Sequence, residues 1–133
     1  MKKKKKKKLI SIRRLLKLCH AAWSKAVRIR DGKCVTCGTT EDLQAHHCLL
    51  PKSKSSGTRF LLDNGITLCM RDHLYVFHKG LGTKNWYDKL KWEIDSRVSL
   101  ERQGEITELS REEKRWTRDE LVEVLRLLED RII

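Results

Sequence analysis

The sequence predicts a small α+β domain in which a strand, a loop, a second strand and a helix form a core between longer helices. Two observations support this prediction. Most cysteines and histidines lie in one stretch of about forty-five residues, 34–78, at spacings typical of metal ligands. Apolar residues on both sides of this stretch recur at intervals of three and four, as in amphipathic helices. We therefore expect four segments: a disordered lysine arm (1–8), a basic helix (9–31), a core (32–80) and a helical extension (83–133).

Positive charge is concentrated at the amino-terminal end of the chain. Residues 1–33 contain fourteen lysines and arginines against one aspartate, whereas residues 34–133 contain sixteen basic and seventeen acidic side chains. A segment of this charge density attracts polyanions, because each phosphate that it neutralises releases condensed counterions. Nucleic acid is therefore the expected partner. The run Lys2–Lys8 is also consistent with a solvated tail, a nuclear-import signal or a contact with an anionic membrane surface.

Two classes of protein are disfavoured. The chain has no apolar run of the roughly 18 residues that a transmembrane helix needs, so we do not expect a membrane protein. Arg13 and Arg14 interrupt the apolar stretch after the lysines, which argues against a secretion signal. An odd number of cysteines with one C-x-x-C pair favours metal binding over disulfides. We expect an intracellular protein, in the cytoplasm or nucleoid, with the nucleus as an alternative if the lysines act as an import signal.

The first helix is predicted from an apolar stripe that ends before Gly32, a typical stop signal. The stripe consists of Ile12, Leu15, Leu16, Cys19, Trp23, Ala26 and Val27. The opposite face carries the basic residues Arg14, Lys17, Lys25 and Arg28. We expect the apolar side to rest on the cysteine-rich core, which leaves the basic side either to contact phosphate or only to keep the helix soluble.

The core begins with the tight turn Cys34-Val-Thr-Cys37-Gly38, which has the form of a zinc knuckle. Residues 43–49 form a predicted strand that leads into a polar, basic loop at 51–57. Asp63-Asn64-Gly65 is a turn signal of the hairpin type before a second strand at 66–68. Residues 69–79 are expected to be helical.

Beyond residue 83 the sequence predicts helices without a catalytic motif. Trp86, Leu90 and Ile94 lie four residues apart on one helix, and Thr117 and Glu120 form a capping box at the start of the last helix. From residue 92 onward the chain has eight basic and twelve acidic residues. We therefore interpret these helices as packing elements, or as the interface of a homodimer, rather than as nucleic-acid contacts.

Cys34, Cys37 and Cys69 are candidate ligands of a structural Zn²⁺ ion, which is usually held by four ligands in a tetrahedron. Asp72 occupies the position that would complete a second C-x-x-C pair, and it is our first choice as fourth ligand. A water molecule, a nearby histidine or an empty, degraded site are the alternatives. Cys48 is disfavoured because it should project from the strand face opposite its neighbour, residue 47.

Residues 34–78 contain more histidines than one zinc ion needs as ligands in addition to the cysteines. The order C-x-x-C, His46-His47, Asn64, C-x-x-D, His73 and His78 resembles the HNH endonucleases, in particular small phage-type members with a zinc knuckle. The resemblance covers residues 34–78, about a third of the chain. It implies a ββα-metal (His-Me finger) core, a phage or prophage origin and hydrolysis of phosphodiester bonds in DNA.

The resemblance also implies a role for each residue. His46 and His73 would bind a catalytic divalent cation (Mg²⁺, Mn²⁺, Ni²⁺ or Zn²⁺), His47 would be the general base, and Asn64 would hold the loop that carries the base. A neutral imidazole, with a reference pKa of about 6.5, can accept a proton from water at physiological pH. The cation would stabilise charge on the phosphate and on the leaving oxygen.

His78 is a further candidate ligand, although its spacing does not fit a regular helix. Residues five apart in an α-helix lie about 140° apart around the axis, whereas residues four apart lie about 40° apart. Either the helix contains a π-type turn, or it ends before His78, or His78 is not a ligand.

Lys52, Lys54 and Arg59, in the loop after the histidine pair, are candidate phosphate contacts. No segment resembles a recognition helix, so we expect weak sequence preference or selection by DNA shape. The leading hypothesis is a metal-dependent DNA endonuclease with structural Zn²⁺ and one catalytic cation. The alternatives are a zinc-braced DNA-binding protein with a decayed catalytic site and a zinc-mediated protein-interaction module.

Overall fold

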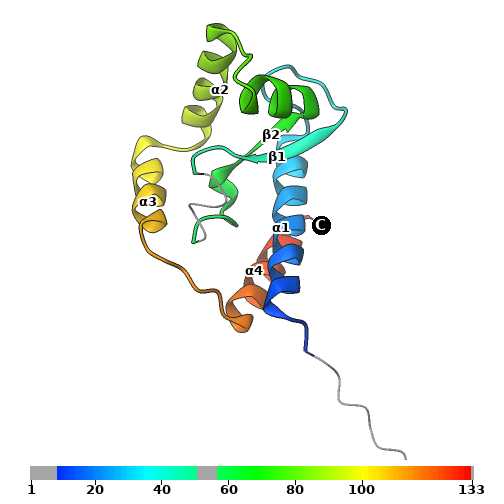
Figure 1. Cartoon of the computed structure of the whole chain (residues 1–133), viewed down its shortest axis with the longest axis vertical. Helices are drawn as coiled ribbons and strands as arrows, with labels where there is room; N and C mark the ends of the chain where they lie inside the picture. Colours follow the sequence, from blue (N-terminus) through cyan, green and yellow to red (C-terminus); the bar gives the residue numbers. More distant parts are fainter. Residues whose placement is uncertain (1–8, 51–56, 133) are drawn as a thin grey trace, which may run out of the picture.

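The computed structural model describes residues 9–50 and 57–132. The lysine arm (Lys2–Lys8) and the loop residues Lys52 and Lys54 lie outside the described residues, so the hypotheses about them stay predictions. The described part is a mixed α and β structure, as expected, with a two-stranded antiparallel sheet beside a long helix (Figure 1). None of its helices is long and apolar enough to span a membrane.

Helix α1 (Ile12–Asp31) has a specific cap at each end. The hydroxyl of Ser11 accepts a hydrogen bond from the backbone N–H of Arg14, and Gly32, with a φ of 71°, ends the helix as predicted. Helix α1 packs on the cysteine-rich core (32–80) as expected, through the sheet. Its apolar face packs against the sheet and α4 (Arg118–Asp130), because α4 brings its own apolar stripe to that face (Figure 1). The buried members of this core are Leu15, Cys19, Ala22, Trp23, Val27, Phe60, Leu121 and Leu128.

The antiparallel sheet carries the histidine pair. Strand β1 (Leu43–His47) pairs with β2 (Gly65–Cys69), and the register places His46 opposite Ile66. Successive side chains of a strand point to opposite faces. The last two residues of β1, His46 and His47, are therefore presented on different sides of the sheet.

The segment between the strands ends in η1 (Leu62–Asn64), a short 3₁₀ helix directly before β2. The turn predicted directly before the second strand is present as this 3₁₀ helix and does not have the form of a hairpin turn, because the connection between the strands is far longer than a hairpin loop. Gly65 serves close packing instead. A Cβ at this position would lie 2.5 Å from Cγ2 of Val27 and 2.7 Å from Cζ2 of Trp23, so the glycine lets β2 approach α1.

Strand β2 continues into η2 (Arg71–His78), which is a π-helix. The order strand, loop, strand, helix is the predicted one (Figure 1). Of the three alternatives for His78, the structure contains the first, a π-type turn that includes this residue.

Three further helices follow along the chain: α2 (Lys84–Arg97), α3 (Leu100–Ser110) and α4. The capping box at the start of α4 is confirmed. The sequence reasoning missed α3, which is separated from α2 by the extended, buried Val98 and is capped by Ser99. In Figure 1, α2 and α3 lie along the side of the molecule away from α1.

Asp31, at the end of α1, connects three elements. Its carboxylate accepts a hydrogen bond from the backbone N–H of Thr67 in β2 at 2.9 Å and pairs with Arg30 and with Arg97 of α2. Burial alone would raise the pKa of Asp31. The hydrogen bond and charge of Arg30, together with Arg97 and Thr67, outweigh burial and hold this pKa below its ordinary value.

We expect Asp31→Asn to lower the free energy of unfolding by about 2 kcal/mol at pH 7, because the amide loses the charge-assisted hydrogen bonds. A carboxyl group with a lowered native pKa stabilises the fold above its unfolded pKa of about 3.9, and this contribution is lost as the pH falls through the native value. Urea unfolding should therefore show the full difference between wild type and variant at pH 7 and a shrinking difference in acid.

The control is Asp88→Asn, which removes an exposed carboxylate that pairs with Lys84 along one turn of α2. This change should alter stability by less than about 0.5 kcal/mol. An Asp31→Asn protein as stable as the wild type at pH 7 would contradict the bridging role of Asp31.

Candidate metal centres and the histidine pair

The four side chains predicted to bind zinc lie together, and we call them the cysteine–aspartate cluster. The ligand atoms of Cys34, Cys37, Cys69 and Asp72 all lie within 4.8 Å of one another. The sulfur atoms of Cys37 and Cys69 are 3.7 Å apart, and Sγ of Cys34 lies 3.5 Å from Oδ2 of Asp72. Tetrahedral zinc, with bonds of about 2.3 Å to sulfur and 2.1 Å to oxygen, would separate these pairs by roughly 3.8 and 3.6 Å. The geometry of the cluster therefore fits zinc.

Asp72 is fully buried and is oriented by two donors. The hydroxyl of Thr36, between the two cysteines of the turn, donates to its Oδ2 at 2.6 Å, and the indole N–H of Trp86 in α2 donates to the same atom at 3.4 Å. Burial opposes ionisation, but the hydrogen bonds of Thr36, Trp86 and Cys34 outweigh it and lower the pKa of Asp72. By contrast, burial raises the pKa of the Cys69 thiol, so a bound cation would be needed to keep this sulfur ionised at neutral pH.

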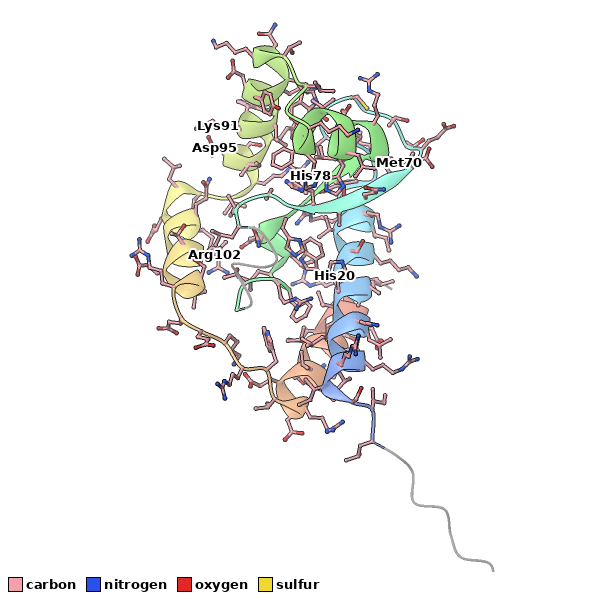
Figure 2. The ribbon with its side chains drawn as sticks, viewed as in Figure 1. His20, Met70, His78, Lys91, Asp95 and Arg102 are labelled. Carbon is pink, nitrogen blue, oxygen red and sulfur yellow. The ribbon has the colours of Figure 1, made fainter. Side chains whose placement is uncertain are left out.

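A second group consists of His46 from β1 with His73 and His78 from η2, and we call it the histidine cluster. Its ligand nitrogens also lie within 4.8 Å of one another. The Nε2 atoms of His73 and His78 are 3.0 Å apart, near the roughly 3.3 Å expected for two nitrogens on a tetrahedral zinc ion. The π-helix brings these rings together, because its hydrogen bonds join residues five apart. Figure 2 shows His78 beside β1.

The buried ring of His46 has the properties of a metal ligand. Its Nε2 is buried and has no hydrogen-bond partner within residues 9–50 and 57–132. Phe77 packs edge-on against the ring, with centroids 4.2 Å apart. Burial, followed by the charges of His73 and His78, lowers the pKa of His46 to about 3, so the ring is neutral at physiological pH. A neutral imidazole with an unsatisfied nitrogen is a ligand for a divalent cation.

Gln44 belongs to this site, although the sequence reasoning missed it. Its side-chain oxygen lies 2.7 Å from Nδ1 of His73, so Nδ1 carries the proton and Nε2 keeps the lone pair that faces the cluster. Gln44 stands two residues before His46, on the same face of β1. Strand alternation could therefore have identified it.

We expect Gln44→Leu to weaken divalent-cation binding at the histidine cluster by about 10- to 100-fold, because the ring of His73 loses its orienting partner. Calorimetric titration of Co²⁺ into protein that already holds zinc at the cysteine–aspartate cluster measures this affinity. Gln44→Glu, which keeps an acceptor, should retain tight binding, and Gln103→Leu in α3 is a control outside the site. Equal Co²⁺ affinity of Gln44→Leu and wild type would refute the orienting role.

His47 faces the other side of the sheet, toward α1. Its ring stacks on the indole of Trp23 with centroids 4.0 Å apart and an interplanar angle of 12°. Nε2 of His47 lies 3.0 Å from the carbonyl oxygen of Arg59. A carbonyl oxygen only accepts hydrogen bonds, so Nε2 carries the proton and the lone pair of the neutral ring is on Nδ1. His47 is thus held in one tautomer, with Nδ1 as the atom that can accept a proton.

Asn64 fixes the chain just after the histidine pair. Its side-chain oxygen accepts hydrogen bonds from the backbone N–H groups of Leu49 and Leu50, both at 3.0 Å, and its amide donates to the carbonyl of Leu50 at 3.2 Å. Its backbone oxygen also accepts a hydrogen bond from the N–H of Cys48 at 3.1 Å. Asn64 is fully buried, so water does not compete for these contacts. The residue therefore fastens the segment that leaves β1 to the start of β2.

The described basic residues that were predicted to contact phosphate differ in their surroundings. Lys17 and Arg59 line the same groove, whereas Lys25 borders a separate cavity against α4. Nε of Arg28 donates to a carbonyl oxygen of its own helix at 3.2 Å, and Arg14 is exposed on α1. The structure thus brings together one lysine of α1 and the arginine of the loop.

Neither a protein-family model, nor a curated protein, nor a solved structure matches this chain. The assignment of a function therefore depends on the sequence motifs and on the geometry of the two clusters and of His47.

Proposed function

We propose that this protein is a metal-dependent endonuclease of the HNH type, which hydrolyses phosphodiester bonds in DNA. One observation carries the proposal. His46 and His47, the last two residues of β1, face opposite sides of the sheet. On one side is the histidine cluster, which could hold a divalent cation, and on the other is His47, which can accept a proton. On this proposal β1, β2 and η2 form a ββα-metal core.

In-line displacement at phosphorus needs a proton acceptor beside the attacking oxygen and positive charge near the leaving oxygen, and His47 and a cation at the histidine cluster, both at the end of β1, would supply these two functions. Nδ1 of His47 would take a proton from water as the water oxygen bonds to phosphorus and the bond to the 3′ oxygen breaks. A divalent cation held by His46, His73 and His78 would supply charge stabilisation at the phosphate and the leaving oxygen. Asn64 would keep His47 in position by holding the end of β1.

The cysteine–aspartate cluster would be structural rather than catalytic. It links the turn at 34–38 to the start of η2 and, through Trp86, to α2. Zinc with four protein ligands has no position left for water or substrate, as in structural zinc sites. Such a brace would hold η2 in place and thereby set the positions of His73 and His78.

Cleavage of supercoiled plasmid DNA tests the proposal. Purified protein should nick or linearise the plasmid in at least one of Mg²⁺, Mn²⁺, Ni²⁺ and Zn²⁺, with 5′-phosphate and 3′-hydroxyl ends as the HNH resemblance implies. Removal of the divalent cation from the histidine cluster should stop cleavage, and adding the cation back should restore cleavage. DNA binding without cleavage in every cation would instead support a zinc-braced DNA-binding module.

A further inference from the structure

A groove on the α1 side of the sheet is lined by Arg13, Leu16, Lys17, His20 and Arg59. Its volume is about 350 Å³, more than ten times the roughly 30 Å³ that one water molecule occupies in the liquid. The groove can therefore admit a phosphate group. Three of its five lining residues are cations and none is acidic. Figure 2 shows His20 on α1, on the side of β1 opposite to His78.

The cations of this groove lack carboxylate partners. Within the described part of the chain, Arg13, Lys17 and Arg59 make no ion pair, whereas other arginines do, such as Arg97 with Asp31. Neighbouring cations without counter-charges create a positive potential. The groove is therefore suited to an external anion.

Arg59 gives the strongest indication of such an anion. Its Nε is buried and has no hydrogen-bond partner among the residues that the structure describes, while its guanidinium lies over the ring of Phe60 at 4.8 Å. Burying the Nε–H group without a hydrogen-bond partner costs free energy, while the side chain as a whole is only partly buried and lines the groove. A phosphate oxygen pair, which a guanidinium can contact through two N–H groups, would offset this cost.

The groove ends beside the proposed general base. The backbone carbonyl of Arg59 accepts the hydrogen bond from Nε2 of His47 at 3.0 Å, and the ring centroids of His20 and His47 are 5.9 Å apart. Arg59 thus contributes its side chain to the groove and its backbone to the orientation of His47. An anion in the groove would lie next to the substrate atoms that His47 faces.

We propose that this groove is a phosphate-binding track that holds the DNA backbone beside the scissile bond, with Arg13, Lys17 and Arg59 as its phosphate contacts. The proposal rests on the endonuclease function proposed above and adds the path of the bound strand, along α1 and over Arg59. Phosphate contacts position DNA without reading its bases. The track therefore supplies affinity and placement and no sequence preference.

The matched variants Lys17→Gln and Lys25→Gln test the track. Each removes one charge from an exposed lysine of α1, but only Lys17 lines the groove. Binding of a short fluorescent duplex is measured by anisotropy at several salt concentrations, in a His47→Ala background that prevents cleavage. Arg13→Gln, also exposed, provides a second groove variant that does not disturb the core.

Lys17→Gln and Arg13→Gln should each weaken binding about 3- to 10-fold at low salt and flatten the slope of log K against log salt by about 0.9. Lys25→Gln should leave that slope unchanged. Equal slopes for Lys17→Gln and Lys25→Gln would overturn the proposal. This holds whether both slopes equal that of the parent protein or both are flatter than it.

Hydrolysis of bis(p-nitrophenyl) phosphate by the wild-type protein separates this proposal from the endonuclease itself, because so small a diester does not need the track. If the wild type hydrolyses it while the salt slopes are equal, the track is wrong and the catalytic proposal stands. If the wild type hydrolyses neither this diester nor DNA, but Lys17→Gln flattens the slope, the endonuclease proposal is wrong, and the groove binds the DNA backbone without placing a scissile bond.

Discussion

His47→Gln is expected to reduce the rate of DNA cleavage by about 10²- to 10⁴-fold, the usual contribution of a general base. The glutamine amide can still donate to the carbonyl of Arg59, as Nε2 of His47 does at 3.0 Å, but it cannot accept a proton as imidazole can. The side chain lies on the opposite side of β1 from the histidine cluster. Metal content should therefore be unchanged.

Single-turnover cleavage at saturating DNA, measured with zinc and manganese content on the same samples, checks this prediction. The midpoint of urea unfolding of the variant should lie close to that of the wild type, because the glutamine amide replaces the hydrogen bond that the ring makes. His47→Ala, which also removes the stack on Trp23, should be equally inactive and less stable. Cleavage by His47→Gln at the wild-type rate would show that this residue is not the base.

Removal of zinc from the cysteine–aspartate cluster is expected to unfold the region around β2 and η2. The surrounding core is small; its buried members are Cys34, Val35, Ile66, Leu68, Cys69 and Leu90. Structural zinc contributes on the order of 10 kcal/mol of apparent binding energy to small domains, whereas whole domains have a net stability of only about 5–15 kcal/mol. The binding free energy that is lost with the ion is therefore larger than the free energy by which this small core can stabilise the region.

Tryptophan fluorescence during chelation measures this effect, because the indole of Trp86 donates a hydrogen bond to Asp72 inside the cluster. Cys69→Ser should show the same loss of structure without chelator. Cys48→Ser is the matched control, since Cys48 is a partly buried cysteine that belongs to neither cluster. A zinc-free protein with an unchanged unfolding midpoint would contradict a structural role of the ion.

The ligands of the cysteine–aspartate cluster were predictable from the sequence because their spacings are local, whereas the histidine ligands were predicted from the resemblance to HNH endonucleases. The turn from Cys34 to Cys37 and the motif from Cys69 to Asp72 each bring their ligands together within one turn of chain. The two strands were also predicted, and Asn64 stands directly before the second of them.

The parts that the sequence did not reveal depend on tertiary contacts or on small differences in helix geometry. The five-residue step from His73 to His78 fits a π-helix and not an α-helix, and local propensity does not decide between them. Trp86 reaches Asp72 only because α2 folds back over the core. Trp23 was predicted as a core residue, but its stack on His47 depends on the packing of α1 against the sheet.

The central claim is that His46, His73 and His78 hold the cation on which DNA cleavage depends. Its most direct test is plasmid cleavage by protein that carries zinc at the cysteine–aspartate cluster, followed while Mn²⁺ is titrated in. We expect the rate to rise as a single equivalent of Mn²⁺ binds. We also expect His73→Ala to keep its zinc and its fold but neither to bind this equivalent nor to cleave DNA. Cleavage by His73→Ala at the wild-type rate would show that cleavage does not depend on a cation at the histidine cluster.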